Sequence, residues 1–220
     1  MEIFPVAHIK NDYVEKFGIP RQSGKVKNLS YIIFEEKYRH PDAIREIESF
    51  SHLWLIFDFS MSHRSEFIPT VRPPRLGGNK KVGVFASRSP FRPNSMGISC
   101  VKLIEVKKDS THGNILVVEG ADLLNNTPIY DIKPYIPYSD CKPNAKKGYT
   151  TKNSDYKLKV VFNCSTENIP KEKIKEIKQI LSEDPRPSYK EESEKIYKMK
   201  YADFDISFKV INKTTYILSF

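Results

Sequence analysis

Arginines set among prolines make the stretch SRSPFRPNSMGIS, residues 87–99, the first candidate for chemistry in this sequence. Proline fixes the backbone angle φ, so the stiffened chain holds Arg88 and Arg92 at reduced entropic cost. A guanidinium held in this way is suited to a carboxylate or a phosphate, which it can bind through paired hydrogen bonds. The stretch therefore predicts an anion-binding loop that leads directly into the strand that follows it.

Two other loops share this chemistry. GIPRQSG, residues 18–24, places Arg21 and Gln22 between glycines, and VRPPRLGGNKK, residues 71–81, is stiffened by prolines and rich in cations. The cations of the second loop are Arg72, Arg75, Lys80 and Lys81. Any one loop is most simply a stiff connection whose arginines pair with surface acids. Three such loops in one small domain favour a ligand site.

Several familiar sites are excluded by spacing. No G-x-G-x-x-G follows a strand, so a Rossmann-type dinucleotide site is unsupported. Residues 18–26 are not a phosphate loop, because Gly18 and Gly24 are one residue too far apart and Val26 replaces the Ser or Thr that would hold magnesium. The five histidines and three cysteines match no metal-ligand spacing, so we expect no metal site. The odd, distant cysteines indicate reduced thiols and a cytoplasmic protein.

The net charge is +9, and six of these charges lie in residues 141–220. This excess is compatible with a polyanionic partner, with RNA or DNA ahead of a membrane, and equally with a Lys- and Glu-rich surface kept for solubility. No apolar run approaches the roughly 18 residues that a membrane helix needs, and the first residues lack the pattern of a secretory signal. We therefore expect a folded protein with no membrane partner.

Short apolar or alternating runs separated by turn residues dominate the chain and predict strands. They include HLWLIFDFSM, ISCVKLIEV, ILVVEGADL and PIYDIKPYI, and a final hairpin turns at Asn212-Lys213. Strands without long helical crossovers indicate an antiparallel sheet or a closed barrel. Helices are predicted only at PDAIREIESF (residues 41–50) and PKEKIKEIKQILSED (residues 170–184). The polar, basic residues 140–155 suggest a boundary between two domains.

A turn at Asn125-Asn126 precedes the last of these strands in the first domain. Asparagine tolerates left-handed backbone, so this pair can occupy a position where glycine is common. The backbone amides of the turn, with Leu124 beside them, could line an adenine-like ring. The alternative is an ordinary hairpin turn.

Motifs spread along the chain resemble the TrmO (TsaA-like) family. They are IPRQ…G, FSHLWLIF, TVRPPRLGGN, VGVFASRSPFRPNSMGIS, GADLL…TPIYDIKPYIPY and DPRPSY, in this order and nearly from end to end. The resemblance implies a mainly β protein, with an antiparallel β-barrel in residues 1–145 that binds S-adenosylmethionine. A small, basic α+β domain in residues 146–220 would contribute to tRNA binding, and the protein would act as a homodimer in the cytoplasm.

The activity that the resemblance implies is methyl transfer from S-adenosylmethionine to N6 of the threonylcarbamoyl-modified adenosine next to the anticodon. The positions that match the family's donor-binding motifs are Pro20, Arg21, Gln22, Ser60, Met61, Arg88, Cys100, Leu124, Asn125, Asn126 and Thr127. Ser60-Met61 stands where the family often has a polar pair with His. Asn125-Asn126 stands where the family has Asp-Gly, which keeps the turn and removes a carboxylate.

In DPRPSY, Arg186 is expected to bind the substrate's threonine carboxylate or a neighbouring phosphate, and Asp184 and Tyr189 are expected to orient a base or accept a proton. Without the resemblance, this segment would be read as a helix stop and linker. The cations expected to bind the tRNA anticodon stem-loop are Arg72, Arg75, Lys80, Lys81 and Arg92. Phe91, Tyr149 or Tyr189 could stack on an unpaired base.

Two other functions remain open. The barrel could be a non-catalytic module that binds RNA or senses S-adenosylmethionine, having kept the pocket and lost the chemistry. A weaker alternative is a related methyltransferase that acts on another small molecule or nucleic acid.

Overall fold

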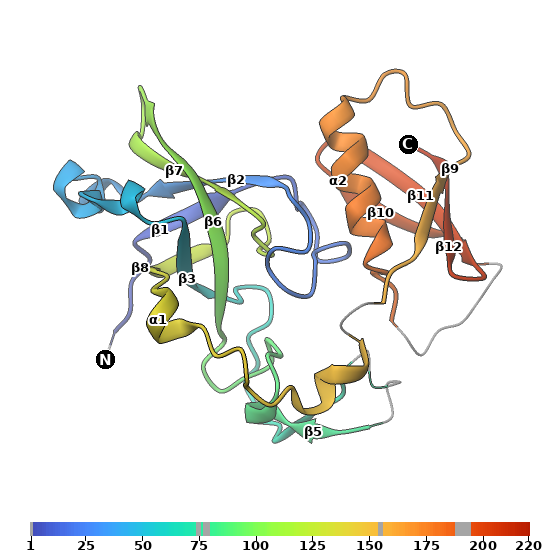
Figure 1. Ribbon diagram of the computed structural model, residues 1–220, viewed down its shortest axis with the longest axis horizontal. Helices are drawn as coiled ribbons and strands as arrows, with labels where there is room; N and C mark the ends of the chain where they lie inside the picture. Colours follow the sequence, from blue (N-terminus) through green and yellow to red (C-terminus); the bar gives the residue numbers. More distant parts are fainter. Residues whose placement is uncertain (1, 74–75, 77–79, 154–155, 188–194) are drawn as a thin grey trace.

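The computed structural model describes residues 2–73, 76, 80–153, 156–187 and 195–220, and it shows two lobes built on separate sheets (Figure 1). The strands of the first lobe are β1 (Ala7–Lys10), β2 (Leu29–Phe34), β3 (His52–Asp58), β6 (Met96–Asp109), β7 (Gly113–Glu119) and β8 (Pro128–Pro134). They pair in the order β1-β2-β7-β6-β3-β8, and β8 pairs back with β1, so the ring is closed. The prediction of a mainly β protein is confirmed.

Every pairing in the ring is antiparallel. Alternate side chains point inward, since successive residues of a strand face opposite sides. The inward set includes Ile9, Leu53, Leu55, Leu116 and Ile129, all fully buried. The interior of the ring is therefore a packed core, and a ligand must bind at one of its ends.

Strand β6 connects the two sides of the ring. Its first half pairs with β3 and its second half with β7, and the register shifts between Leu103 and Glu105, where the strand bends. Residues 87–95 lead into its first residue, Met96. The proline-braced arginine loop therefore meets the ring at the N-terminal end of β6.

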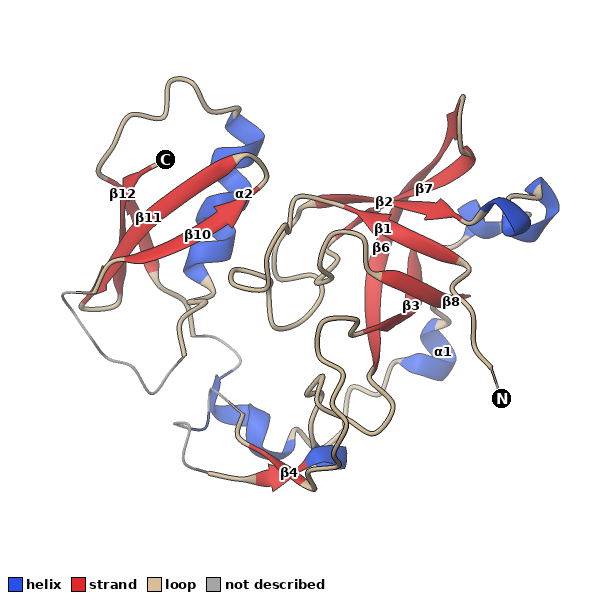
Figure 2. Ribbon diagram, turned by 180° about the vertical axis from the view of Figure 1, so that it is seen from behind, coloured by secondary structure: helices blue, strands red, loops and turns tan. Residues whose placement is uncertain are grey.

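The second lobe is a four-stranded sheet covered on one face by a helix (Figures 1 and 2). Its strands lie in the order β10 (Tyr197–Tyr201), β11 (Phe204–Ile211), β12 (Thr214–Ser219) and β9 (Lys159–Phe162), with β9 parallel to β12. Helix α2 (Lys171–Ser182) buries Ile177, Ile180 and Leu181 in this lobe's core. The predicted second helix is confirmed. So is the final hairpin, whose turn residues Asn212 and Lys213 both have positive φ.

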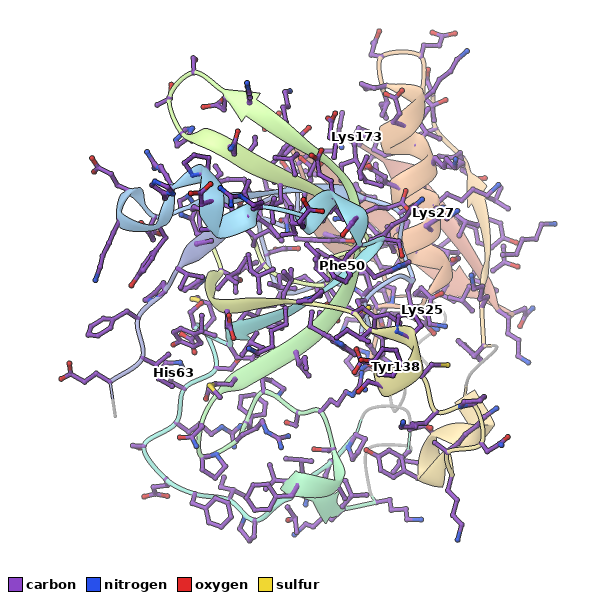
Figure 3. All side chains as sticks on the ribbon, turned by 60° about the vertical axis from the view of Figure 1, so that its left-hand side comes forward. Lys25, Lys27, Phe50, His63, Tyr138 and Lys173 are labelled. Carbon is purple, nitrogen blue, oxygen red and sulfur yellow. The ribbon has the colours of Figure 1, made fainter. Side chains whose placement is uncertain are left out.

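The loop between β1 and β2 ties the lobes together. Its Tyr13 and Val26 are buried in the core of the second lobe. Gly18 has φ of +101°, a conformation that favours glycine, and a Cβ there would lie 2.4 Å from Met199 Sδ and displace that side chain. Lys173, which projects from α2 (Figure 3), donates to Asp12 at 2.5 Å across the junction. The first lobe thus supplies part of the second lobe's core.

The segment between β3 and β6 projects from the end of the ring as a third, smaller layer (Figure 1). It contains the two-stranded hairpin of β4 (Thr70–Val71) and β5 (Val82–Gly83). Among the residues that the structure describes, the short helices include η1 (Glu36–Tyr38), η2 (Pro41–Ile44), η3 (Ile47–Ser49), η5 (Val84–Ala86), α1 (Pro137–Asp140) and η6 (Gly148–Asn153). Within the described residues, no helix has the length and apolar character needed to cross a membrane.

The predicted helix at residues 41–50 is wrong. The structure has two separate 3₁₀ turns there, η2 and η3. Arg45 is extended, with ψ of 135°, and Glu46 is left-handed, with φ of 66°. A right-handed helix cannot continue through a left-handed residue, so the apolar spacing of Ile44 and Ile47 serves packing against the ring core instead.

Candidate functional site

A cavity of about 890 Å³ opens at the end of the ring, and the three arginine-bearing loops predicted from the sequence meet around it. Arg21 comes from the first loop, Arg72 from the second, and Arg88 and Arg92 from the third. Leu124 and its neighbours close another side. The volume falls within the range of small-molecule sites, roughly 300–1,000 Å³.

The floor of the cavity is built from the ends of β3 and β6. Phe57 and Gly97 are opposite each other in the ladder, and a Cβ at Gly97 would lie 2.3 Å from the Phe57 ring. Phe57 also makes an edge contact with Phe59, with ring centroids 5.1 Å apart. Because only glycine leaves room for the Phe57 ring, this residue pair sets the shape of the floor.

A half-buried carboxyl, that of Asp122, lies beside this floor. Ser99 Oγ donates to Asp122 Oδ1 at 2.5 Å. Burial raises the pKa of Asp122 to about 6, against the lowering effects of the Ser99 hydrogen bond and of the Arg88 charge. The cavity therefore contains an acid whose ionisation responds to charges placed near it.

A second carboxylate, Asp58, stands at the end of β3 and also lines the cavity. It is buried and bonded to His63, whose Nε2 lies 2.7 Å from Asp58 Oδ1. His63 itself is exposed at the base of the projecting segment (Figure 3). Burial, together with the Asp58 charge, raises the pKa of Tyr130. Asp58 is thus positioned from two sides.

The arginine loops are held by specific hydrogen bonds. Arg88 Nη1 donates to Gln22 Oε1 at 2.6 Å, which joins the first and third loops at the cavity wall. Arg92 Nη1 donates to the carbonyls of Val84 and Ser87, at 3.3 and 2.7 Å. These contacts place cations around the cavity before any ligand arrives, an arrangement suited to an anionic group.

The structure gathers most of the predicted donor-contact residues on the cavity wall. These are Pro20, Arg21, Gln22, Ser60, Met61, Arg88, Leu124 and Thr127. The cavity wall does not include Asn125 and Asn126, which instead hold the turn against β1. The Asn126 amide donates to Ile9, the Asn125 side chain accepts from Asn11, and Asn126 has φ of 64°. The interpretation of this pair as a left-handed turn is confirmed, and the adjoining Leu124 and Thr127 face the cavity.

Cys100, the remaining predicted donor contact, is also not part of the cavity wall. It pairs with Trp54 in the ladder between β3 and β6 and is half-buried. Burial, together with the Asp140 charge, raises the pKa of its thiol. Its neighbours Ile98 and Ser99 line the cavity in its place.

Two of the predicted catalytic residues, Asp184 and Arg186, lie in the second lobe. Asp184, left-handed with φ of 51°, accepts both Arg186 Nε at 2.8 Å and Arg186 Nη2 at 3.1 Å, and it also accepts from Tyr156 at 3.1 Å. Neither Asp184 nor Arg186 lines the cavity. They are linked to it by Arg21, whose Nη2 donates to the Arg186 carbonyl at 2.9 Å. Tyr189 lies outside the described residues.

The predicted RNA-binding cations fall into two groups. Arg72 and Arg92 are on the cavity wall, whereas Lys80 and Lys81 are exposed on the approach to β5. Arg75 lies outside the described residues.

Some cavity residues were not singled out in the sequence. Lys16, Asp58, Ser99 and Asp122 all line it. Asp122 belongs to the GADLL motif quoted above, and Asp58 follows a buried apolar strand, where a carboxylate is unexpected. These two signals could have identified the acids. In the described part of the chain, no three His, Cys, Asp or Glu side chains are grouped so as to hold a metal ion.

A closed ring of antiparallel strands, a cation-rich cavity at its end and a small helix-on-sheet lobe define a two-lobed, mainly β class of ligand-binding protein, distinct from doubly wound nucleotide-binding folds. Family models match both lobes: the tRNA-methyltransferase O N-terminal domain over residues 8–141, and the TrmO C-terminal domain over residues 155–220. The chain therefore belongs to the tRNA-methyltransferase O family, as the sequence motifs indicated.

Individual relatives agree with this assignment. The chain is 41% identical over 214 residues to a tRNA (adenine(37)-N6)-methyltransferase of Escherichia coli K12, covering 92% of this chain and 90% of the relative. It is 32% identical to a putative S-adenosylmethionine-dependent methyltransferase, RcsF, of Pseudomonas aeruginosa, covering 93% and 90%. A crystal structure of TrmO from P. aeruginosa superposes with a TM-score of 0.78 at 27% identity, covering 100% of this chain and 98% of that one.

Proposed function

We propose that this protein is an S-adenosylmethionine-dependent tRNA methyltransferase that methylates N6 of the threonylcarbamoyl-modified adenosine at position 37, next to the anticodon. The observation that carries the proposal is the convergence of Arg21, Gln22, Arg88 and Leu124 on one cavity, in a chain of the tRNA-methyltransferase O family. Relatives named as adenine(37)-N6 methyltransferases support the same activity.

The cavity has the chemistry that S-adenosylmethionine requires. The donor carries a carboxylate, an ammonium group, a ribose and an adenine around a sulfonium centre. Arg21 and Arg88 can hold the carboxylate, Asp58 and Asp122 can balance the positive groups, and Leu124 offers an apolar surface to the adenine. When bound, the donor supplies an electrophilic methyl group on its sulfur. The ring, which we interpret as the expected β-barrel, would hold that sulfur in a fixed position.

The remaining task of the chain is to align the acceptor and take up its proton. The acceptor nitrogen is part of a urea and is a poor nucleophile, so it must lose its proton as the new bond forms. We assign the uptake of this proton to Asp184 or Tyr189, and the alignment of the acceptor to Arg186, whose carbonyl the Arg21 contact joins to the cavity. Arg186 would bind the threonine carboxylate by exchanging one hydrogen bond to Asp184 for one to the substrate.

The division of labour follows the two lobes. Residues 1–145 would bind the donor, and residues 146–220 would contribute to binding the tRNA. The cations that would contact anticodon-stem phosphates are Arg72, Arg75, Lys80, Lys81 and Arg92, of which Arg72 and Arg92 line the cavity. We further propose that the enzyme is a homodimer and works in the cytoplasm on tRNA.

Nucleoside mass spectrometry tests this function. Wild-type protein, isotopically labelled S-adenosylmethionine and tRNA carrying the threonylcarbamoyl group should yield a labelled methyl on adenosine 37. tRNA lacking that group should yield far less, because the carboxylate for Arg186 is missing. Arg186→Ala should abolish turnover while leaving donor affinity by calorimetry unchanged, and Arg45→Ala, at an exposed arginine paired with Asp42, is the matched control. Donor binding without methylation of any tRNA would favour the sensing module instead.

A further inference from the structure

Two large aromatic side chains are exposed beside the cavity. Phe85 is 73% exposed and Phe67 is 59% exposed, although both sit in the folded segment that projects from the ring. Their rings are nearly parallel, with an interplanar angle of 26° and centroids 6.5 Å apart. Neither belongs to the cavity wall. We call the surface that they form the aromatic shelf; donor binding in the cavity would not account for it.

The shelf is held rigidly from beneath. Phe85 lies in the short helix η5, whose first residue, Val84, is buried. The Val84 amide donates to the Pro69 carbonyl, and its own carbonyl accepts from Ser87 and from Arg92. The backbone that carries the Phe85 ring is thus fixed by several hydrogen bonds, while the ring itself is exposed to solvent. Such preorganisation lowers the entropic cost of binding a ligand on its face.

One cation lies beside the shelf, and another lies at the neighbouring cavity wall. The Arg92 guanidinium lies 5.9 Å from the Phe85 ring centroid, and the Arg64 guanidinium lies 3.7 Å from that of Phe91, which is 38% exposed at the cavity wall. Residues 59–95 carry seven Lys and Arg residues and a single acidic residue, Glu66. Flat rings interleaved with cations match a single-stranded nucleic acid, which has flat bases and a charged backbone.

We propose that the aromatic shelf stacks an unpaired anticodon-loop base of the tRNA, adjacent to the base that enters the cavity. This proposal rests on the proposed function and names the part of the substrate that the projecting segment recognises. A second copy of this chain is a poorer occupant, because a twofold contact through this segment would bring its positive charges against themselves. A stacked base instead lets its own phosphates neutralise the flanking arginines.

The proposal explains how an enzyme acting at one loop position could hold the loop open. Bases in an anticodon loop stack on one another, and extruding one of them loses that stacking energy. A ring on the protein surface that stacks the neighbouring base would compensate for part of this loss. The cavity and the shelf would then bind successive nucleotides of the same loop.

Fluorescence anisotropy with a labelled anticodon stem-loop tests the shelf. Phe85→Ala should weaken binding by between about 5-fold and 150-fold, the range for removal of one base–aromatic contact. Phe67→Ala should weaken it less, and Phe85→Tyr, which keeps a ring, should retain most of the affinity. Phe4→Ala is the matched control, since Phe4 is 62% exposed in the N-terminal segment before β1, and it should bind like the wild type.

Three further measurements make the result decisive. A blunt-ended RNA duplex with the same number of nucleotides should bind wild type and Phe85→Ala equally, because it offers no free base. Donor affinity by calorimetry should not change in Phe85→Ala. Sedimentation should show the same oligomeric state for both proteins. Equal losses on loop and duplex, a loss in Phe4→Ala of the same size, or dissociation into smaller species would each overturn the shelf.

The two proposals can fail separately. If Phe85→Ala binds the loop as tightly as the wild type while the wild type still methylates adenosine 37, the shelf is wrong and the enzyme stands. If loop binding depends on Phe85 and no tRNA is methylated, the shelf stands and the proposed activity is wrong.

Discussion

The floor of the cavity consists of hydrogen-bonded strand ends with buried functional groups, whereas its rim, residues 59–95, consists of proline-stiffened loops with exposed arginines and phenylalanines. On the floor, Gly97 fits under Phe57 with no space for one added carbon, and Asp122 is bonded to Ser99. On the rim, Phe85 is exposed, and so are the cations Arg64, Arg72, Lys80, Lys81 and Arg88. A tightly packed floor selects ligands by their shape, whereas a charged, open rim attracts an anionic ligand through the combined field of its charges. We expect a single floor substitution to cause a large loss of stability or donor affinity. We expect rim substitutions to reduce RNA affinity in proportion to the charge or ring area that they remove.

The largest effect is expected from the pH dependence of stability at Asp122. Its folded pKa of about 6 lies above its unfolded value, so its stabilising contribution is complete below about pH 4 and is lost as the pH rises through 6. The loss amounts to about 3 kcal/mol. Asp122→Asn should remove it, so the free energy of unfolding in urea, measured from pH 4 to pH 7, should fall less steeply than in the wild type. If stability fell equally with pH in both proteins, the folded pKa of Asp122 would not be raised by burial.

Donor affinity should depend strongly on Arg88, a rim residue whose charge acts on the floor residue Asp122. Arg88→Ala removes a charge-assisted contact worth roughly 1.5–3 kcal/mol. Titration calorimetry with S-adenosylmethionine should therefore show about 10- to 150-fold weaker binding. The matched rim variant is Arg64→Ala, which also alters the cavity wall but should mainly affect RNA binding. An equal loss of donor affinity in the two variants would show that the interaction of Arg88 with the floor does not set its contribution to donor binding.

Gly97→Ala should sharpen the description of the floor. The new methyl group would overlap the Phe57 ring, and forcing that ring aside should cost roughly 1–3 kcal/mol of folding free energy. Donor affinity should fall as well, because the ring would move into the cavity. Gly83→Ala is the control on the rim, since no heavy atom lies within 4 Å of a Cβ there. Urea denaturation with calorimetry measures both quantities.

The smallest effect is expected from paired charge reversal on the rim. Lys80→Glu with Lys81→Glu should weaken tRNA binding at physiological salt and reduce the slope of log affinity against log salt by about 2. Donor affinity should not change. Lys107→Glu with Lys108→Glu makes the same change in net charge at the far end of β6 and should leave the slope nearly as it was. Identical slopes in both double variants would mean that the rim cations do not contact phosphates.

The strands and the cavity loops could be predicted because their signals are local. Alternating apolar residues specify strands. Proline next to arginine specifies a stiff cationic loop whatever its position in the fold. The helix at residues 41–50 failed because its apolar spacing is also satisfied by two 3₁₀ turns around the left-handed Glu46. Nothing in the local sequence distinguishes these two outcomes.

Contacts that depend on ring closure could not be read from the sequence. Whether Cys100 or its neighbour Ser99 reaches the cavity depends on strand register and on the tilt of β6, which are set by pairing with both β3 and β7. The same holds for Asp122, whose burial comes from the surrounding lobe. The bidentate contact between Asp184 and Arg186 is made with Asp184 in a left-handed conformation, and the linker sequence does not predict that conformation.

The loop of residues 11–28 has a consequence for any attempt to divide the molecule. Tyr13 and Val26 fill the interior of the C-terminal lobe, and the same loop carries Arg21 and Gln22 to the cavity. Cutting the chain after the first lobe would remove the packing around these side chains and make the donor site less rigid. The isolated second lobe would have cavities in its core. The two lobes should therefore unfold as one cooperative unit, and a substitution that destabilises one lobe should also destabilise the other.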